Sequence, residues 1–157
     1  MVVKDIVAED FVNYKKPSMF IIFPYCSFKC EKECGRKVCQ NSNIFQLPNI
    51  EIKNDTILLS YLSNSITHSL VFGGLEPFDS WEDMLSLIED FRRVSDDDIV
   101  IYTGYTEDEL RDKVVTLQQY HNVIVKFGRY VPDKESHYDE LLGVDLANDE
   151  QYARKIS

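Results

Sequence analysis

The sequence has no long hydrophobic run, and it is poor in basic residues, tryptophan and histidine. No apolar stretch approaches the roughly 20 residues that a membrane-spanning helix needs, which argues against a membrane protein. The chain has 17 Lys and Arg against 27 Asp and Glu, a net charge of −10, which disfavours binding to nucleic-acid phosphates. His68, His121 and His137 show no mutual spacing typical of a metal site. We therefore expect a soluble, cytoplasmic protein that binds neither membranes nor nucleic acid.

No internal repeat or low-complexity segment divides the chain, and its 157 residues are enough for one hydrophobic core. We predict a single domain over residues 1–157. Within it lie a cysteine loop at residues 25–42 and, much later, a polar C-terminal segment at residues 129–157, for whose end we expect a helical turn.

Apolar runs of strand length alternate with amphipathic segments of helical period. Strands are expected at residues 19–23, 68–72, 99–102 and 123–127, with a short one near 50–52. Helices are expected at residues 56–64, 81–94 and 106–120, capped by Asp55, by Asp79 or Ser80, and by Thr106 with Glu109. This alternation predicts an α/β fold, an open partial (βα) barrel with a mostly parallel sheet of four or five strands. Ligands of such folds lie at the carboxyl ends of the strands.

All four cysteines fall within the fourteen residues from Cys26 to Cys39, separated by three, three and four residues. Such clustering in a Lys-rich, Gly-containing loop favours ligands over buried core residues. Local disulfides are one alternative, but no secretory signal precedes the loop. A structural zinc site is another, although it commonly uses two close pairs of ligands separated by a longer spacer. The short, even spacing favours an iron–sulfur cluster, which is held by several thiolates from one short run.

Cys26-x-x-x-Cys30 after a hydrophobic strand resembles the start of the radical S-adenosylmethionine signature, C-x-x-x-C-x-Φ-C. The third cysteine of that signature would fall at Glu33, so the spacing is not met as written. If the six residues 31–36 are an insertion, Lys37-Val38-Cys39-Gln40-Asn41 matches the end of the family motif. The rival alignment takes Cys34 as the third ligand and leaves Cys39 spare.

Two further motifs follow strands and carry the same resemblance. Gly73-Gly74-Leu75-Glu76-Pro77 is similar to the Gly-Gly-Glu-Pro segment that binds the methionine amino group in that family, with Leu75 as an extra residue. Thr103-Gly104-Tyr105 resembles a strand end of the small enzymes that activate anaerobic ribonucleotide reductase. Looser similarity to these enzymes extends through residues 125–130 to Asn148-x-x-Gln151.

The resemblance implies an enzyme, a radical S-adenosylmethionine oxidoreductase with a 4Fe-4S cluster and S-adenosylmethionine as cofactors. It implies Cys26, Cys30 and Cys39 as cluster ligands, Gly73, Gly74 and Glu76 as ligands of the methionine, and Val38, Thr103 and Tyr105 beside the cofactor. Cleavage of the cofactor would give a 5′-deoxyadenosyl radical.

The implied partners are a glycyl radical enzyme, such as anaerobic ribonucleotide reductase, and an electron donor, such as flavodoxin or ferredoxin. Two alternatives stay open. The first is a radical S-adenosylmethionine enzyme that acts on a small molecule or a peptide. The second is a noncatalytic module in which all four cysteines bind a cluster or zinc.

Overall fold

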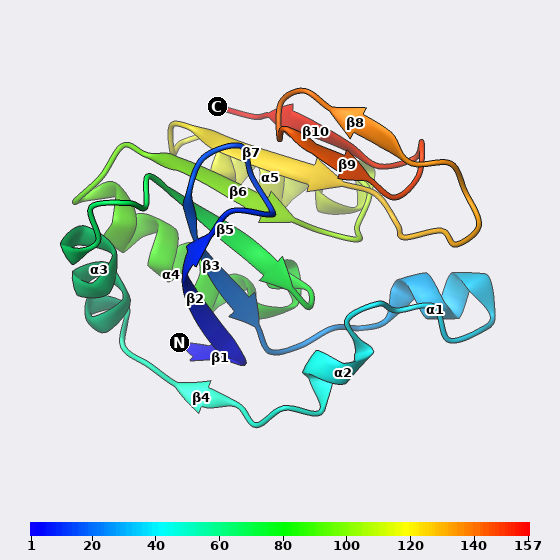
Figure 1. Cartoon of the computed structure of the whole chain (residues 1–157), viewed down its shortest axis with the longest axis horizontal. Helices are drawn as coiled ribbons and strands as arrows, with labels where there is room; N and C mark the ends of the chain where they lie inside the picture. Colours follow the sequence, from blue (N-terminus) through cyan, green and yellow to red (C-terminus); the bar gives the residue numbers. More distant parts are fainter.

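A mixed β-sheet of six strands forms the centre of the molecule (Figure 1). The computed structural model describes all residues from 1 to 157. Across the sheet the strands lie in the order β10–β7–β6–β5–β3–β2. Their bounds are β2 Asp5–Asp10, β3 Ser18–Phe23, β5 Ser69–Gly74, β6 Asp98–Tyr102, β7 Val123–Phe127 and β10 Tyr152–Lys155. The four central strands, β3, β5, β6 and β7, are parallel, whereas β2 and β10 are antiparallel to their neighbours.

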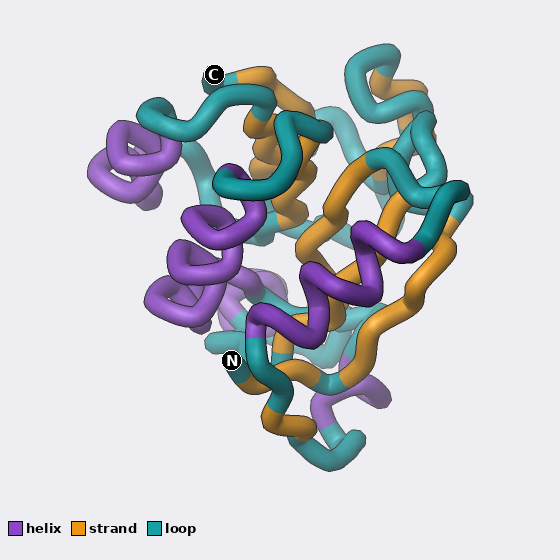
Figure 2. The backbone as a smooth tube through the Cα atoms, turned by 90° about the vertical axis from the view of Figure 1, so that its left-hand side faces the viewer, coloured by secondary structure: helices purple, strands orange, loops and turns teal.

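The helices cover one face of this sheet (Figure 2). They are α3 (Asn54–Ser63), α4 (Trp81–Arg92) and α5 (Arg111–Leu117), with the 3₁₀ turns η1 (Pro77–Ser80) and η2 (Asp108–Leu110). Successive strand residues point to opposite faces, so Leu70 and Phe72 pack with the helices while Val71 faces the other way. Since other segments cover both faces of the central strands, most residues of these strands are apolar.

The opposite face is covered by the loop after β2 and by a hairpin formed by β8 (His137–Asp139) and β9 (Val144–Leu146). Tyr14, Leu142 and Leu146 are buried there against the central strands. The Tyr102 hydroxyl donates a hydrogen bond of 2.6 Å to the carbonyl oxygen of Asn13. This layer covers only part of the face and leaves space at the carboxyl ends of the strands.

The cysteine loop leaves the carboxyl end of β3 and carries two short helices, α1 (Lys29–Cys34) and α2 (Ser42–Phe45), which Figure 1 shows beside that edge of the sheet. The chain then returns through β4 (Ile50–Glu51), which pairs with β1 (Val2–Val3) near the N-terminus. None of the helices is both long and apolar enough to cross a membrane.

The sheet differs from the expected one at its two edges. It has six strands rather than four or five, because β2 and β10 add to the parallel core. Both edge strands are largely exposed, so neither shows the apolar pattern on which the sequence prediction depends. The prediction of a helical turn near the C-terminus is wrong, since residues 152–155 form a strand that pairs with β7.

Two of the predicted helix caps make no side-chain capping hydrogen bond. Asp55 lies inside the first turn of α3, which Lys53 precedes without a side-chain cap. Asp79 lies in η1, and its carboxylate binds Ser27 and Tyr105. The alternative, Ser80, is the residue at the N-cap position of α4, although its side chain makes no capping hydrogen bond. The capping box is confirmed, because Thr106 and Glu109 exchange hydrogen bonds between backbone and side chain.

Candidate iron–sulfur site

A cavity of about 370 Å³ opens at the carboxyl ends of the central strands. The cysteine loop forms one wall, the ends of β5 and β6 form the floor, and residues 145–151 close the far side. Because parallel strands end at one edge of a sheet, segments distant in sequence meet here.

Three of the four cysteines line this cavity, namely Cys26, Cys30 and Cys39, whereas Cys34 does not. All four are free and half-buried. Cys34 is the last residue of α1, four residues after Cys30. No three His, Cys, Asp or Glu side chains in the molecule are gathered as closely as the ligands of a single metal ion.

Burial raises the pKa of two of these thiols, Cys26 and Cys39, and so favours their protonated form. Burial raises the pKa of Cys26 to about 12, and the nearby carboxylates of Glu76 and Asp79 add to the shift, while a hydrogen bond from the Phe28 amide opposes it. Burial also raises the pKa of Cys39. A bound metal cation reverses this preference, because a coordinating thiol is deprotonated. Metal binding here therefore releases protons.

The glycine motif forms the floor of the cavity, where Gly73 and Gly74 end β5. Gly74 has φ +80°, and a Cβ atom on it would collide with Ile22 on β3. The side-chain amide of Asn41 donates a hydrogen bond of 2.6 Å to the Gly74 carbonyl oxygen. Only glycine allows this backbone to approach β3 so closely while its carbonyl reaches the cysteine loop.

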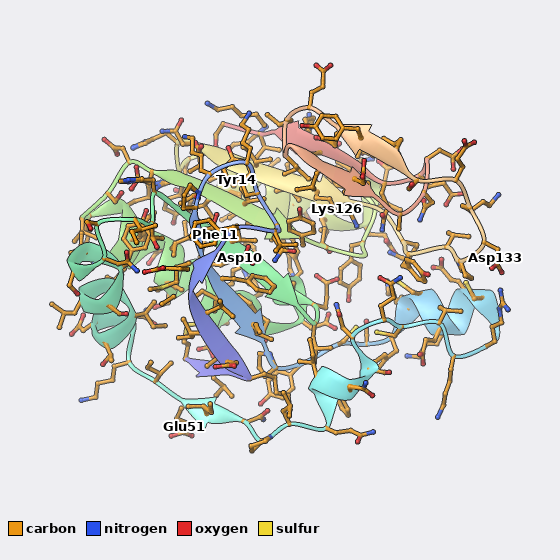
Figure 3. The ribbon with its side chains drawn as sticks, in the orientation of Figure 1. Asp10, Phe11, Tyr14, Glu51, Lys126 and Asp133 are labelled. Carbon is orange, nitrogen blue, oxygen red and sulfur yellow. The ribbon has the colours of Figure 1, made fainter.

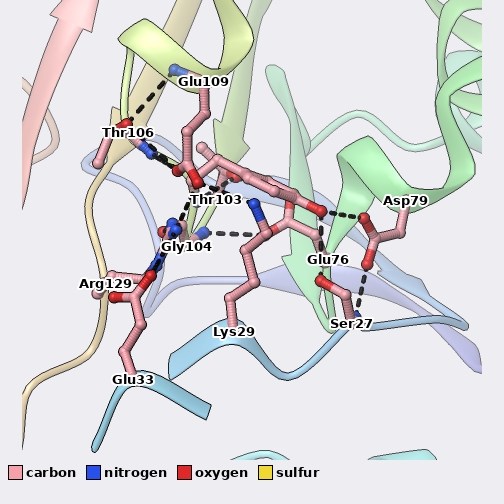
Figure 4. A network of polar contacts seen from close by, with 11 residues as sticks. Ser27, Lys29, Glu33, Glu76, Asp79, Thr103, Gly104, Thr106, Glu109 and Arg129 are labelled. Atoms are coloured by element: carbon pink, nitrogen blue, oxygen red, sulfur yellow. Dashed lines mark hydrogen bonds and ion pairs between the residues drawn. The ribbon is translucent and has the colours of Figure 1, made fainter. Parts of the chain in front are cut away.

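Glu76 lines the cavity and is only 5% exposed. Its Oε1 accepts hydrogen bonds from the Thr103 hydroxyl, at 2.8 Å, and from the Phe78 amide, at 3.2 Å. Its Oε2 accepts one from the Gly104 amide at 2.9 Å (Figure 4). Burial raises the pKa of Glu76 to about 7, although these three hydrogen bonds oppose the shift. The carboxylate thus joins the end of β5 to the end of β6.

The other expected cofactor residues lie further from the cavity. Thr103 is buried behind Glu76 and does not line the cavity. Tyr105 lines a smaller neighbouring hollow, and its hydroxyl donates to Asp79 at 2.5 Å. Val38 is half-buried and outside both spaces. Gly104, between Thr103 and Tyr105, does line the cavity, and a Cβ atom on it would lie 3.4 Å from the sulfur of Cys30.

Lys126 is a site residue that the sequence interpretation missed. It lies on β7, is 6% exposed and lines the cavity (Figure 3). Its ammonium group donates to the carbonyl oxygens of Gly128, at 3.2 Å, and Thr103, at 3.5 Å, and it forms no ion pair. Burial lowers its pKa to about 8, which the negative charges of Glu76 and Cys30 oppose. The available signal was a lysine inside an otherwise apolar strand.

The C-terminal segment completes the far wall. Asn148 is fully buried and donates from its side-chain amide to the Arg129 carbonyl oxygen at 3.0 Å. Gln151 lines the cavity and accepts a hydrogen bond from the Ala147 amide. The Asn148-x-x-Gln151 pattern thus holds the chain end against the site.

The donor set fits an iron–sulfur cluster, because three thiols from one short loop face a single cavity. This places the molecule in the class of iron–sulfur proteins, and comparison with protein families agrees. The family described as 4Fe-4S single cluster domain matches residues 17–146, most of the chain, including all four cysteines. The protein belongs to this family and is a 4Fe-4S cluster-binding domain. It has no significant match among curated proteins or solved structures.

Proposed function

We propose that the protein is a radical S-adenosylmethionine enzyme whose cluster is held by Cys26, Cys30 and Cys39. The observation that carries this proposal is that these three thiols line one cavity with Gly73, Gly74 and Glu76, while Cys34 lies outside it. Three thiolates on a four-iron cluster leave one iron open, and an open metal position is where a cofactor binds. When bound, such a cluster supplies the electron that cleaves S-adenosylmethionine to a 5′-deoxyadenosyl radical.

The residues of the chain suit the methionine end of this cofactor. Lys126 offers a buried ammonium group without a carboxylate partner, which suits the methionine carboxylate. The Gly73 backbone and the carboxylate of Glu76 offer acceptor oxygens for the amino group. Opposite charges held in a partly buried cavity orient a zwitterionic ligand in one direction. In this proposal the protein residues bind S-adenosylmethionine and orient it, while the cluster and S-adenosylmethionine supply the radical chemistry.

The proposed reaction generates a glycyl radical on a partner, an anaerobic ribonucleotide reductase, after reduction by a donor such as flavodoxin or ferredoxin. The similarity of residues 101–106 to such activating enzymes supports this choice. The second candidate is an enzyme acting on a small molecule or a peptide. This second candidate is favoured by the size of the cavity, which extends past the cysteines to Asn13, Tyr102 and Asp145 and so leaves room for a bound substrate.

The test is anaerobic reconstitution of the protein with iron and sulfide, followed by addition of dithionite and S-adenosylmethionine. We expect 5′-deoxyadenosine to form, as measured by liquid chromatography. A competent reductase added to the same mixture should then show a glycyl radical signal in electron paramagnetic resonance. Cofactor cleavage without that signal favours the second candidate. A reduced cluster that does not cleave the cofactor contradicts the proposal and leaves a noncatalytic module.

A further inference from the structure

Helix α1 carries Cys30 and Cys34, yet it has no buried residue. Most short helices are held in a protein by packing an apolar face against the core. At its start, Phe28 packs edge-on against Phe45 of the same loop, with ring centroids 5.1 Å apart. This contact joins two parts of the cysteine loop and does not fix α1 to the sheet. Another interaction must therefore hold the helix, and with it Cys30, beside the cavity.

The side chain of Arg129 supplies such an interaction (Figure 4). Arg129 follows the end of β7, and its side chain is 8% exposed. Its Nε donates to Oε1 of Glu33 on α1 at 3.0 Å, and its Nη2 donates to Oε1 of Glu109 at 2.7 Å. Its Nη1 donates to the Gly104 carbonyl oxygen. One guanidinium group thus joins α1 to the segments that follow β6 and β7.

Lys29 forms a second link from the same helix. Its ammonium group lies 2.8 Å from Oε1 of Glu109 and 4.5 Å from the centroid of the Tyr105 ring. The Arg129 guanidinium lies 5.7 Å from that centroid. Lys29 and Glu33 are four residues apart and lie on one face of α1, with Cys30 between them in sequence. Both ends of the helix are therefore bound to Glu109, either directly or through Arg129.

The Lys29 link and the Arg129 link differ in how exposed their cations are to solvent, and therefore in how much each stabilises the position of α1. Exposed ion pairs contribute little to stability, and the Lys29 side chain is 41% exposed. The Arg129 guanidinium is nearly covered and makes directional hydrogen bonds to two carboxylates, although Glu33 is itself 57% exposed. A covered charge loses more than an exposed one when a partner is removed. Arg129 also lines the same small hollow as Cys26 and Cys30. The dominant link therefore lies directly behind two of the proposed cluster ligands.

We infer that Arg129 is a positioning residue that holds α1, and so fixes Cys30 at the cavity before the cluster is assembled. Glu33 and Glu109 are its partners in this role. The inference rests on the proposed ligation by Cys26, Cys30 and Cys39, but not on cleavage of S-adenosylmethionine. Loss of Arg129 frees the helix and leaves the sheet and its core unchanged.

The first experiment uses the protein without its cluster. Hydrogen exchange followed by mass spectrometry compares the wild type with Arg129→Gln and Arg36→Gln. Arg36 is a matched control, because it lies in the same loop and pairs with Asp133. Both side chains of this pair are exposed, Arg36 at 62% and Asp133 at 82%. We expect exchange over residues 29–35 to be at least tenfold faster in Arg129→Gln and unchanged in Arg36→Gln. Equal exchange in all three proteins overturns the inference.

The second experiment measures the cluster after anaerobic reconstitution. We expect Arg129→Gln to hold less than half of the wild-type iron and its reduced cluster to give an altered paramagnetic resonance line shape. Arg129→Lys keeps the charge but not the planar fork, so we expect an intermediate iron content. Full iron content with a wild-type line shape in Arg129→Gln contradicts the role.

A third variant, Glu33→Gln, keeps the inference testable if Arg129→Gln does not fold. Glu33 is 57% exposed, so its replacement leaves the core intact. We expect it to increase exchange over residues 29–35 and to reduce iron content, though less than Arg129→Gln. No change in either measurement with Glu33→Gln also overturns the inference. The proposed function fails separately, if the wild type holds its cluster but does not cleave the cofactor.

Discussion

The side-chain amide of Asn41 donates a hydrogen bond of 2.6 Å to the carbonyl oxygen of Gly74. These residues are 33 positions apart in sequence, and each belongs to a motif that follows a different strand. The bond ties the cysteine loop to the glycine motif across the mouth of the cavity. Since the Asn41 side chain is exposed, this residue can be replaced, and the hydrogen bond removed, without disturbing the core.

Replacing Asn41 should therefore affect cofactor binding more than folding. We expect Asn41→Ala to weaken binding of S-adenosylmethionine about fivefold to tenfold, because a hydrogen bond contributes about 1 kcal/mol. Asn41→Asp should do at least as much, since a carboxylate cannot donate to a carbonyl. Anaerobic equilibrium dialysis gives the affinity. Asn49→Ala is the control, because its bond to the Tyr25 hydroxyl is longer, at 3.4 Å, and outside the cavity; an equal loss there would contradict the prediction.

The cysteines should separate into two groups. We expect Cys26→Ala, Cys30→Ala and Cys39→Ala each to abolish the absorbance of the reconstituted cluster and the production of 5′-deoxyadenosine. Cys34→Ala should keep both, because Cys34 does not line the cavity. Iron and sulfide analysis of the four variants provides the measurement. If Cys34→Ala loses the cluster while Cys39→Ala retains it, the rival ligand alignment is correct.

Lys126 should be needed for the cofactor but not for the fold. A buried ammonium group without a carboxylate partner costs stability, so we expect Lys126→Met to melt at the same temperature as the wild type or higher. The same variant should bind S-adenosylmethionine at least tenfold more weakly, because the methionine carboxylate loses its cation. Calorimetry gives both quantities. Lys113→Met is the control, since Lys113 donates to the Phe78 carbonyl oxygen and does not line the cavity.

Asp98 should make stability depend on pH at the opposite end of the sheet. Burial favours the neutral acid, but hydrogen bonds from Lys16, at 2.6 Å, and Tyr14, at 2.8 Å, outweigh it and lower the pKa of Asp98. A lowered folded-state pKa stabilises the protein above the ordinary carboxyl pKa, and this contribution is lost as pH falls through the folded value.

We expect Asp98→Asn to lower the free energy of unfolding by about 1–3 kcal/mol at pH 7 and to matter progressively less below about pH 4. Urea unfolding of the cluster-free protein at several pH values measures this difference. Asp108→Asn is the control, because the ion pair of Asp108 with Arg111 is exposed. A difference between Asp98→Asn and wild type that stays constant with pH would refute the assignment.

The local elements could be predicted where the pattern of burial is simple. The four central strands are mostly apolar because both of their faces are covered, and α4 shows a clear apolar face. The edge strands β2 and β10 escaped prediction because their stability comes from backbone hydrogen bonds to a neighbour. Their side chains are largely exposed and carry no periodic signal.

The sequence by itself determined that the cysteine loop and the glycine motif would meet. Each follows a strand, the strands alternate with helices, and parallel strands connected in this way end at one edge of a sheet. This argument needs only local patterns and chain connectivity, which are properties of the sequence.

Tertiary structure alone decided which side chains at that edge face the cavity. Cys34 and Cys39 are equivalent as residue types, but the turn of α1 and the contacts that hold it leave Cys34 outside and Cys39 inside. The sequence marks Lys126 only as a lysine in an apolar strand and does not mark Arg129 at all, whereas the fold places Lys126 in the cavity and Arg129, just after β7, against Glu33 of α1. The physical reason is that side-chain direction and burial depend on packing between segments that are far apart in the chain, which no local pattern encodes.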